Sequence, residues 1–144
     1  MISKALFSSN KNEWETPQDL FDKLDAIYQF ETDLAATPEN AKCKKFFTPE
    51  QDSLKQTWGG CCWCNPPYGR NIGEWVKKAA LSGGEIVMLL PARTDTAWFH
   101  DWVLPYARIE FIRGRLKFSY KGEKAQSAPF PSMLAFYNER TRKG

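Results

Sequence analysis

Short apolar runs alternate with segments of helical periodicity along this chain. The clearest run is Glu85–Pro91 (EIVMLLP), an unbroken apolar stretch typical of a strand buried on both faces of a parallel sheet. Apolar residues recur at helical spacing over residues 17–28, 72–81 and 96–104. Further strands are expected at residues 30–36, 44–47, 61–64 and 108–113, with a closing pair formed by 116–120 and 133–137. This alternation predicts an α/β fold whose sheet is covered by helices on both faces.

Two segments carry the signature of a helix start. Thr16-Pro17-Gln18-Asp19 and Thr48-Pro49-Glu50-Gln51 each offer Thr as the N-cap, Pro at the first helical position and an acid in the first turn. They predict a helix from residue 17 and a brief second helix that ends near Trp58-Gly59-Gly60. Capping the backbone is therefore one role open to both threonines, and contact with a ligand is the other.

The length and composition of the chain are typical of an ordinary soluble domain. A chain of 144 residues with 42% hydrophobic and 26% charged residues is long enough to bury one core, so we expect a single domain over 1–144. No stretch approaches the length of a membrane span, and residues 1–14 contain no apolar signal core, which favours the cytoplasm. We expect residues 1–12 to be loosely held and 138–144 to form a basic tail.

Charge is distributed unevenly between the two parts of the chain. The net charge is +3, but residues 1–92 carry 10 Lys and Arg against 12 Asp and Glu, whereas residues 93–144 carry 10 against 5. The basic C-terminal part suits a polyanionic partner, although a solvated surface of mixed charge explains the count equally well.

The four cysteines predict neither a disulfide framework nor a metal site. Cys61, Cys62 and Cys64 crowd into one predicted strand, and neither they nor Cys43 show paired Cys-x-x-Cys spacing or a nearby His. Buried, reduced thiols are the expected state, and no metal is expected.

The tetrapeptide Asn65-Pro66-Pro67-Tyr68 follows the predicted strand 61–64 and is the most informative motif in the chain. The Asn65 side-chain oxygen and the Pro66 carbonyl are acceptors, and two successive prolines hold them rigidly without offering a donor. Tyr68 offers a flat face for stacking. These groups predict a pocket for a planar ligand with an NH2 group, such as adenine or cytosine. A rigid turn that closes the strand is the alternative.

The placement of the motif favours a binding site. Asp33 and Asn65 both stand at predicted carboxyl ends of strands, and ligands bind at that edge of open α/β sheets. Two polar side chains at one sheet edge are more than a plain turn requires.

With these residues placed, the chain resembles the phage-type DNA N-6-adenine methyltransferases, the Dam family of enzymes that use S-adenosylmethionine (SAM). The likeness spans about residues 12 to 137 and is carried by an ordered set of segments: Glu13-Trp14-Glu15-Thr16-Pro17, Asp33-Leu34-Ala35-Ala36, Asn40-Ala41-Lys42, Asp52-Ser53-Leu54, Trp58, Asn65-Pro66-Pro67-Tyr68, Trp75, Leu90-Pro91-Ala92-Arg93-Thr94, Trp98-Phe99 and Gly114-Arg115-Leu116-Lys117-Phe118. The resemblance implies a compact Rossmann-like methyltransferase domain encoded by a phage or prophage.

The resemblance also implies roles for individual residues in binding SAM. Asp33 resembles the acid that meets the amino group of SAM, and Ala35 and Ala36 stand where many relatives have glycine. Asp52 resembles the acid that contacts the cofactor's adenine. The segment with Trp14, Thr16 and Pro17 resembles the element that closes over the cofactor. The acid that usually holds the ribose has no clear match; Glu50 is a candidate.

The implied reaction is transfer of a methyl group from SAM to adenine N6 of a base flipped out of double-stranded DNA, with Asn65, Pro66, Pro67 and Tyr68 at the reacting amine. Candidates for phosphate contact are Arg93, Arg113, Arg115, Lys117, Lys121 and Lys124.

Other functions remain open at this point. Methylation of cytosine N4, of RNA adenine or of protein glutamine requires the same acceptors. A DNA-binding remnant of the fold without turnover is also possible, and its best support is the absence of Gly-x-Gly from the expected cofactor loop.

Overall fold

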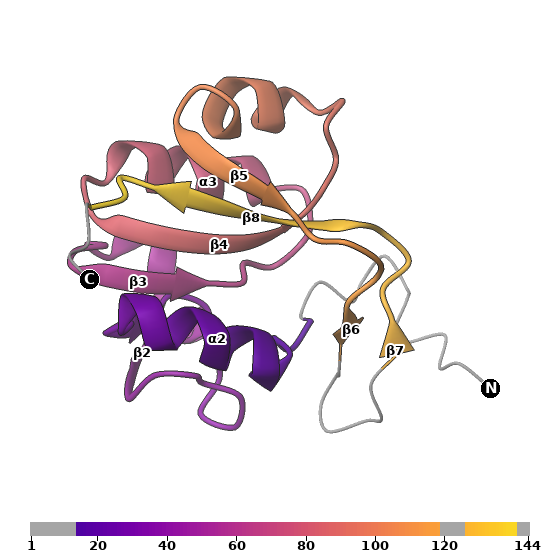
Figure 1. Ribbon diagram of the computed structural model, residues 1–144. Coiled ribbons are helices and arrows are strands. Elements are labelled where there is room, and N and C mark those ends of the chain that lie inside the picture. Colours follow the sequence, from indigo (N-terminus) through magenta and orange to yellow (C-terminus); the bar gives the residue numbers. More distant parts are fainter. Residues whose placement is uncertain (1–13, 119–125, 141–144) are drawn as a thin grey trace.

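A computed structural model describes residues 14–118 and 126–140, and it forms a mixed sheet with helices on both faces (Figure 1). The six-stranded sheet has the order β2-β1-β3-β4-β8-β5, and β6 and β7 form a separate two-stranded hairpin. Strands β2, β1, β3 and β4 run parallel, and β8 is antiparallel to its neighbours β4 and β5. The bounds are β1 Thr32–Asp33, β2 Lys45–Phe46, β3 Cys61–Cys64, β4 Glu85–Pro91, β5 Ala107–Phe111, β6 Lys117–Phe118, β7 Gln126–Ser127 and β8 Ser132–Tyr137.

Helix α2 (Gln18–Tyr28) and helix α3 (Ile72–Leu81) cover opposite faces of the sheet (Figure 1). Phe21 of α2 meets Trp63 of β3 edge to face, with ring centroids 5.7 Å apart. A π-helical turn, η3 (Phe99–Val103), packs beside α3. The predicted α/β architecture, with helices on both faces, is therefore confirmed.

The core is built on β3, β4 and β8, whose residues are all buried. The cysteines are free thiols, and burial raises the pKa of the Cys62 thiol to about 12, so it carries no thiolate character at neutral pH. Within residues 14–118 and 126–140, no His, Cys, Asp and Glu side chains converge as a metal-binding group of three or more. Over the same residues, no helix combines the length and the apolarity needed to cross a membrane.

Several predicted elements differ from the structure. Residues 133–137 do not pair with 116–118, the described part of the expected partner strand. They lie in β8, between β4 and β5, because a strand that is apolar on both faces is stabilised in the middle of a sheet rather than in a peripheral hairpin. The hairpin partner of β6 is β7. Residues 30–36 contain only the two-residue strand β1.

Of the two predicted N-caps, Thr48 is confirmed, with Pro49 at the first helical position, and Thr16 is wrong. Helix α2 begins at Gln18, with Pro17 at the N-cap, and no side chain caps it, so Thr16 is not its cap. The brief helix after Thr48 is a pair of 3₁₀ turns, η1 (Pro49–Gln51) and η2 (Ser53–Lys55), and the Thr48 N–H donates to Gln51 Oε1 at 2.8 Å.

The structure describes only one of the two terminal segments in part. Residues 1–12 lie outside the described part of the chain. The beginning of the expected basic tail is attached to the domain, because Asn138 Nδ2 donates to the Gly84 carbonyl at 2.8 Å and the Arg140 N–H donates to Glu85 Oε2 at 3.1 Å.

Gly84 packs closely against the backbone of Trp58, which leaves no room for a side chain. A Cβ built on it would lie 2.5 Å from the Trp58 carbonyl oxygen, which belongs to backbone and cannot rotate away. We expect Gly84→Ala to lower the free energy of unfolding by about 1–3 kcal/mol, as overpacking does. Urea unfolding followed by circular dichroism measures this.

Gly59→Ala is the matched control, since a Cβ there would meet no atom within 4 Å. It should change stability by less than about 1 kcal/mol. Equal effects of the two substitutions would contradict the packing described at Gly84.

Candidate active site

The carboxyl ends of β1 and β3 meet at one edge of the sheet. Asp33 ends β1 and is the register partner of Trp63, and Asn65 directly follows β3. The Leu34 N–H donates to the Trp63 carbonyl at 2.9 Å, so the hydrogen bonds between β1 and β3 continue to the point where both strands end. The predicted strand-end positions of Asp33 and Asn65 are confirmed.

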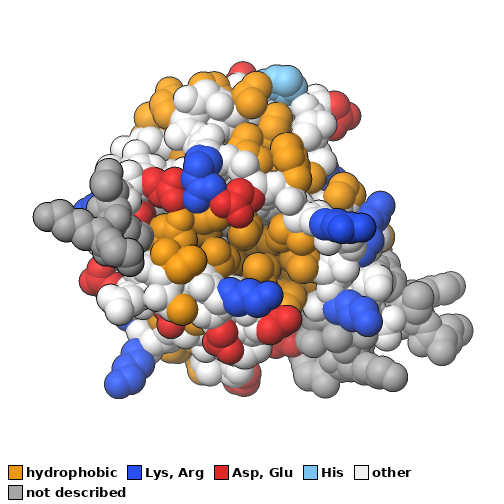
Figure 2. Space-filling view, in the orientation of Figure 1, with side chains coloured by type: hydrophobic (Ala, Val, Ile, Leu, Met, Phe, Trp, Pro, Cys, Tyr) orange, Lys and Arg blue, Asp and Glu red, His pale blue; other side chains and the backbone are white. Residues whose placement is uncertain are grey.

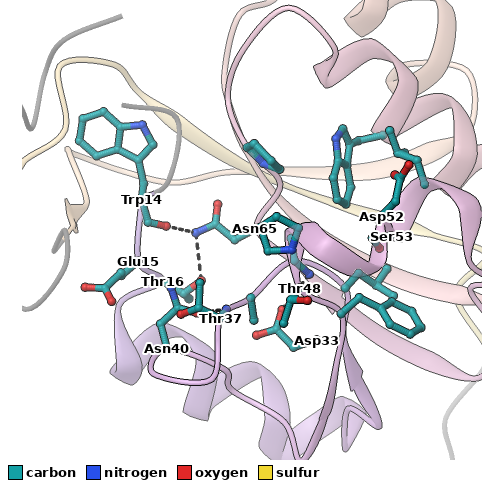
Figure 3. A pocket seen from close by; sticks show the side chains of 18 of the residues that line it. Trp14, Glu15, Thr16, Asp33, Thr37, Asn40, Thr48, Asp52, Ser53 and Asn65 are labelled. Carbon is teal, nitrogen blue, oxygen red and sulfur yellow. Dashed lines mark hydrogen bonds between the residues drawn. The ribbon is translucent and has the colours of Figure 1, made fainter. Parts of the chain in front are cut away.

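A cleft opens at this edge (Figure 3). The space between its walls is about 870 Å³, a volume that includes the solvent at its open mouth. Its walls come from residues 14–16, 33–37, 47–49 and 52–54, together with Asn40, Asn65, Pro67, Asn71 and Trp75. Six of the eight candidate cofactor residues line it: Trp14, Thr16, Asp33, Ala35, Ala36 and Asp52.

Asp33 organises the loop that forms one wall of the cleft. Its Oδ1 accepts the Ala35 N–H at 3.2 Å and its Oδ2 accepts the Lys42 N–H at 3.0 Å. Burial raises the pKa of this carboxyl to about 6, and the two backbone hydrogen bonds limit the rise. A buried carboxylate in a cleft is a natural partner for a cationic group, because binding a cation offsets its desolvation.

The loop that follows Asp33 needs no glycine. Among the described residues, the non-glycine positions with positive φ are Gln29, Asp52 and Asn138, and none lies in residues 34–42. Ala35 and Ala36 therefore adopt their conformations without strain. The absence of Gly-x-Gly, which favoured a non-catalytic remnant, is compatible with an intact loop.

The Asn65 side chain is held in one orientation by the segment before α2 (Figure 3). Its Nδ2 donates to the Trp14 carbonyl and, at 3.1 Å, to Thr16 Oγ1. Because the carbonyl can only accept, the amide nitrogen must face it. Asn65 Oδ1 is then left buried with no hydrogen-bond partner among the described residues. An unpaired buried acceptor is costly unless a ligand supplies the donor.

The rest of the tetrapeptide divides between cleft and core. Pro67 lines the cleft, whereas Pro66 and Tyr68 are buried and are not among the described residues that line it. The Tyr68 hydroxyl donates to the Leu89 carbonyl at 2.9 Å, and its ring meets Phe130 edge to face. The structure thus anchors Tyr68 in the core instead of presenting its full face to the cleft, because a buried hydroxyl requires a partner.

Two other candidates, Pro17 and Glu50, lie differently from expectation, whereas Asp52 lies in the cleft wall as expected. Pro17 is outside the cleft lining and accepts the first helical hydrogen bond of α2, from Phe21 N–H at 3.2 Å. Glu50 is exposed and does not line the cleft; Thr48, which follows β2 and Phe47, does. Asp52 lines it while lying 3.7 Å from Lys55 Nζ.

Sequence reasoning missed part of the apolar wall. Phe47 lines the cleft just before the 3₁₀ turns, Leu54 lines it from within η2, and Trp75, which also packs in the core, lines it from α3. Trp75 Nε1 is a second buried polar atom without a partner among the described residues. Alternating helical and strand periodicity gave no signal for these positions because they lie in loops or on a helix face.

The basic candidates converge on the same side of the fold. Arg93 follows β4 and Arg113 follows β5, and both segments leave the sheet beside the start of β8. There the Ala92 N–H donates to the Pro131 carbonyl, and the Ile112 N–H donates to the Ser132 carbonyl. Arg115 and Lys117 continue into the β6–β7 hairpin. All four side chains are exposed. Figure 2 shows Lys and Arg side chains on the right of this face, the side on which the β6–β7 hairpin lies in Figure 1, and others at its centre and lower left. Lys121 and Lys124 lie outside the described residues.

Comparisons with known proteins identify the family to which this chain belongs. A model of the family "DNA N-6-adenine-methyltransferase (Dam)" matches residues 3–143. A DNA N-6-adenine-methyltransferase of Haemophilus phage HP1 is 31% identical over 145 residues, covering 94% of this chain and 84% of the relative. One from Escherichia phage T1 is 37% identical over 137 residues, covering 90% of this chain, which spans 56% of that longer relative. The chain therefore belongs to the Dam family of DNA N-6-adenine-methyltransferases.

Proposed function

We propose that this protein transfers a methyl group from SAM to N6 of adenine in DNA. The observation that carries the proposal is the Asn65 amide, whose nitrogen is bound to the protein and whose oxygen is buried and unpaired beside the cleft. That arrangement supplies an acceptor and no competing donor, which suits the N–H of an exocyclic amine.

The cleft fits SAM by its chemistry. The buried Asp33 carboxylate suits the cationic amino group, and the acid Asp52 and the hydroxyl of Thr48 suit polar groups of a nucleoside. Phe47 and Leu54 offer apolar surface to its base. When bound, SAM supplies an electrophilic methyl group on a sulfonium sulfur.

The protein's contribution to the reaction is orientation of the amine. Adenine N6 is a weak nucleophile because its lone pair is delocalised into the ring. Asn65 Oδ1 and the Pro66 carbonyl accept its two hydrogens and favour a tetrahedral nitrogen with its lone pair directed at the methyl group. The thiols are not required, since Cys62 and Cys64 are buried with raised pKa values. The released proton passes to water.

Access to a duplex requires the target base to leave the stack. The exposed basic residues around the β6–β7 hairpin and the β4 end suit the phosphates on either side of a flipped nucleotide. We propose double-stranded DNA as the partner and this surface as its contact.

Mass spectrometry of nucleosides tests the proposed reaction. DNA incubated with the protein and SAM should yield N6-methyldeoxyadenosine. N4-methylcytosine would assign the same site to a different amine, and the absence of any methylated nucleoside would contradict the proposal.

The first expected outcome concerns Asn65. Asn65→Ala removes the unpaired acceptor, so kcat should fall by about 10²-fold or more, as when one preorganised polar contact is lost. SAM affinity and Tm should change little. Wild-type turnover in this variant would refute the assignment.

Thr16 provides a matched test of how Asn65 is held. Thr16→Val removes the hydroxyl that accepts from Asn65 Nδ2 while keeping the shape of the side chain. Turnover should fall by about 3- to 10-fold, the value of one hydrogen bond. Thr16→Ser restores the acceptor and should restore most of the rate; equal rates for the two variants would contradict this role.

A pH dependence follows from Asp33. With its pKa raised to about 6, the carboxyl is ionised at pH 7 and mostly protonated at pH 5. A cationic ligand binds the ionised form, so SAM affinity should weaken by about tenfold as the pH falls from 7 to 5. The amino group of SAM stays protonated over this range. Isothermal titration calorimetry measures the profile.

Asp33→Asn is the control, because it removes the titrating group with little change in size. Its SAM affinity should be low and nearly independent of pH. A wild-type affinity that is flat between pH 5 and 7 would contradict direct contact between Asp33 and the cation.

The basic hairpin generates a salt dependence. Charge reversal by Arg115→Glu together with Lys117→Glu should weaken DNA binding and reduce the slope of log K against log salt by about 0.9 for each lost phosphate contact. Fluorescence anisotropy with labelled DNA measures both quantities, and SAM affinity should not change.

Lys23→Glu together with Lys44→Glu is the matched control, since both lysines are exposed and lie on α2 and before β2. This pair makes the same change in net charge. If it weakens DNA binding as much as the hairpin pair, net charge alone accounts for the effect and the proposed surface is wrong.

A further inference from the structure

Within residues 14–118 and 126–140, strand β5 is the last strand at its end of the sheet (Figure 1), so only half of its backbone N–H and C=O groups bond to a neighbouring strand. Phe111 is opposite Met133 of β8, and the next N–H, that of Ile112, donates to the Ser132 carbonyl at 3.0 Å. Because hydrogen-bonded and non-hydrogen-bonded pairs alternate along an antiparallel ladder, Arg108 and Glu110 face β8 with their backbone groups. The N–H and C=O groups of Ala107, Ile109 and Phe111 therefore face away from the sheet.

The side chains of β5 divide into two faces. Ala107, Ile109 and Phe111 lie on one face, and Arg108 and Glu110 lie on the other. Phe111 is 62% exposed, and an exposed apolar segment continues through Leu104 and Tyr106, at 53% and 49%. An open edge that combines outward backbone groups with exposed apolar side chains is a template for another strand.

Arg108 is preorganised at this edge. Its guanidinium lies 4.1 Å from the centroid of the Phe136 ring, and its Nε and Nη2 donate to the Glu139 carboxylate at 2.7 and 2.8 Å. A further hydrogen bond joins Nη1 to Glu110. The positive and negative groups of β5 are thus held in fixed positions two residues apart on one face.

We propose that β5 pairs antiparallel with β5 of a second copy of this chain, centred on Ile109. In that register the outward N–H and C=O groups of Ala107 in one copy pair with those of Phe111 in the other copy. Those of Ile109 pair with the same groups of Ile109 in the other copy. Arg108 of each copy lies opposite Glu110 of the other. The interface is isologous, and the two sheets become one continuous sheet.

Charge selects this register over its neighbours. Centring the pair on Arg108 would place two arginines directly opposite each other, and centring it on Glu110 would do the same with two carboxylates. Like charges at directly opposed positions destabilise an antiparallel pair, whereas opposite charges stabilise it. The sequence Ala-Arg-Ile-Glu-Phe is self-complementary about its middle residue in both charge and hydrogen bonding.

The apolar face supports the same register. Phe111 lies opposite Ala107, the smallest side chain of the strand. Ala107 directly follows the half-exposed Tyr106 in the sequence. The pairing therefore covers the most exposed large apolar side chain of the described residues without a clash between two large rings.

Sedimentation velocity of the full chain, from about 1 µM to about 500 µM, tests the proposal, since a small interface is expected to dissociate at micromolar concentration. The wild-type protein should shift from monomer to dimer over this range. Glu110→Arg should raise the dimer dissociation constant by about tenfold or more, because it places two pairs of cations opposite each other.

Arg108→Glu should have the same effect as Glu110→Arg when each variant is studied alone. An equimolar mixture of the two should form a heterodimer, because every opposed pair then has opposite charges. Since Arg108 also packs on Phe136, the Tm of its variant is measured first.

Phe111→Ser tests the edge without touching Arg108, and Leu81→Ser is its matched control, as Leu81 is 60% exposed at the end of α3. Phe111→Ser should weaken the dimer and Leu81→Ser should leave it unchanged. A monomer at every concentration would overturn the proposal. So would a dimer that survives both Glu110→Arg and Phe111→Ser, or one weakened equally by Leu81→Ser.

Discussion

The orientation of a single amide is the constraint on which the site depends. Asn65 Nδ2 is bound by two acceptors from the segment before α2, the Trp14 carbonyl and the Thr16 hydroxyl, so Oδ1 is the group left for a ligand. Were the amide free to rotate, its NH2 end would repel the amine that we propose as its ligand. The rigid prolines after Asn65 and the parallel pairing of β1 with β3 set its position, and the N-terminal segment sets its direction.

That segment also joins the cleft to the basic hairpin. The Trp14 indole packs edge to face against Phe118 of β6 and Phe130, with ring centroids 5.6 Å apart in each case, and Tyr68 packs on the same Phe130 ring. The residues that hold the amide, the buried tyrosine and the hairpin with Arg115 and Lys117 thus share one aromatic cluster. The proposed surface for DNA and the proposed site for its target base are therefore connected through packed side chains.

Local patterns in the sequence predicted the parts of this arrangement that are local. Asp33 and Asn65 could be placed at strand ends because each follows a short apolar run, and β4 was evident from its unbroken apolar character. The contact between Asn65 and Trp14 spans 51 residues and could not be derived from spacing. The same limit applies to β8, whose apolar pattern fits several partners until the sheet is assembled, and to Tyr68, whose hydroxyl partner Leu89 lies in another strand. The structure adds that the loop after Asp33 reaches its shape without glycine.

The most direct test of the account is a crystal structure of the protein with DNA and a SAM analogue that cannot donate its methyl group. The account predicts that the amine of a flipped adenine lies at hydrogen-bond distance, about 3 Å, from Asn65 Oδ1, while Nδ2 remains on the Trp14 carbonyl. A complex in which the amide has rotated, or in which the target amine is bound away from Asn65, would contradict it.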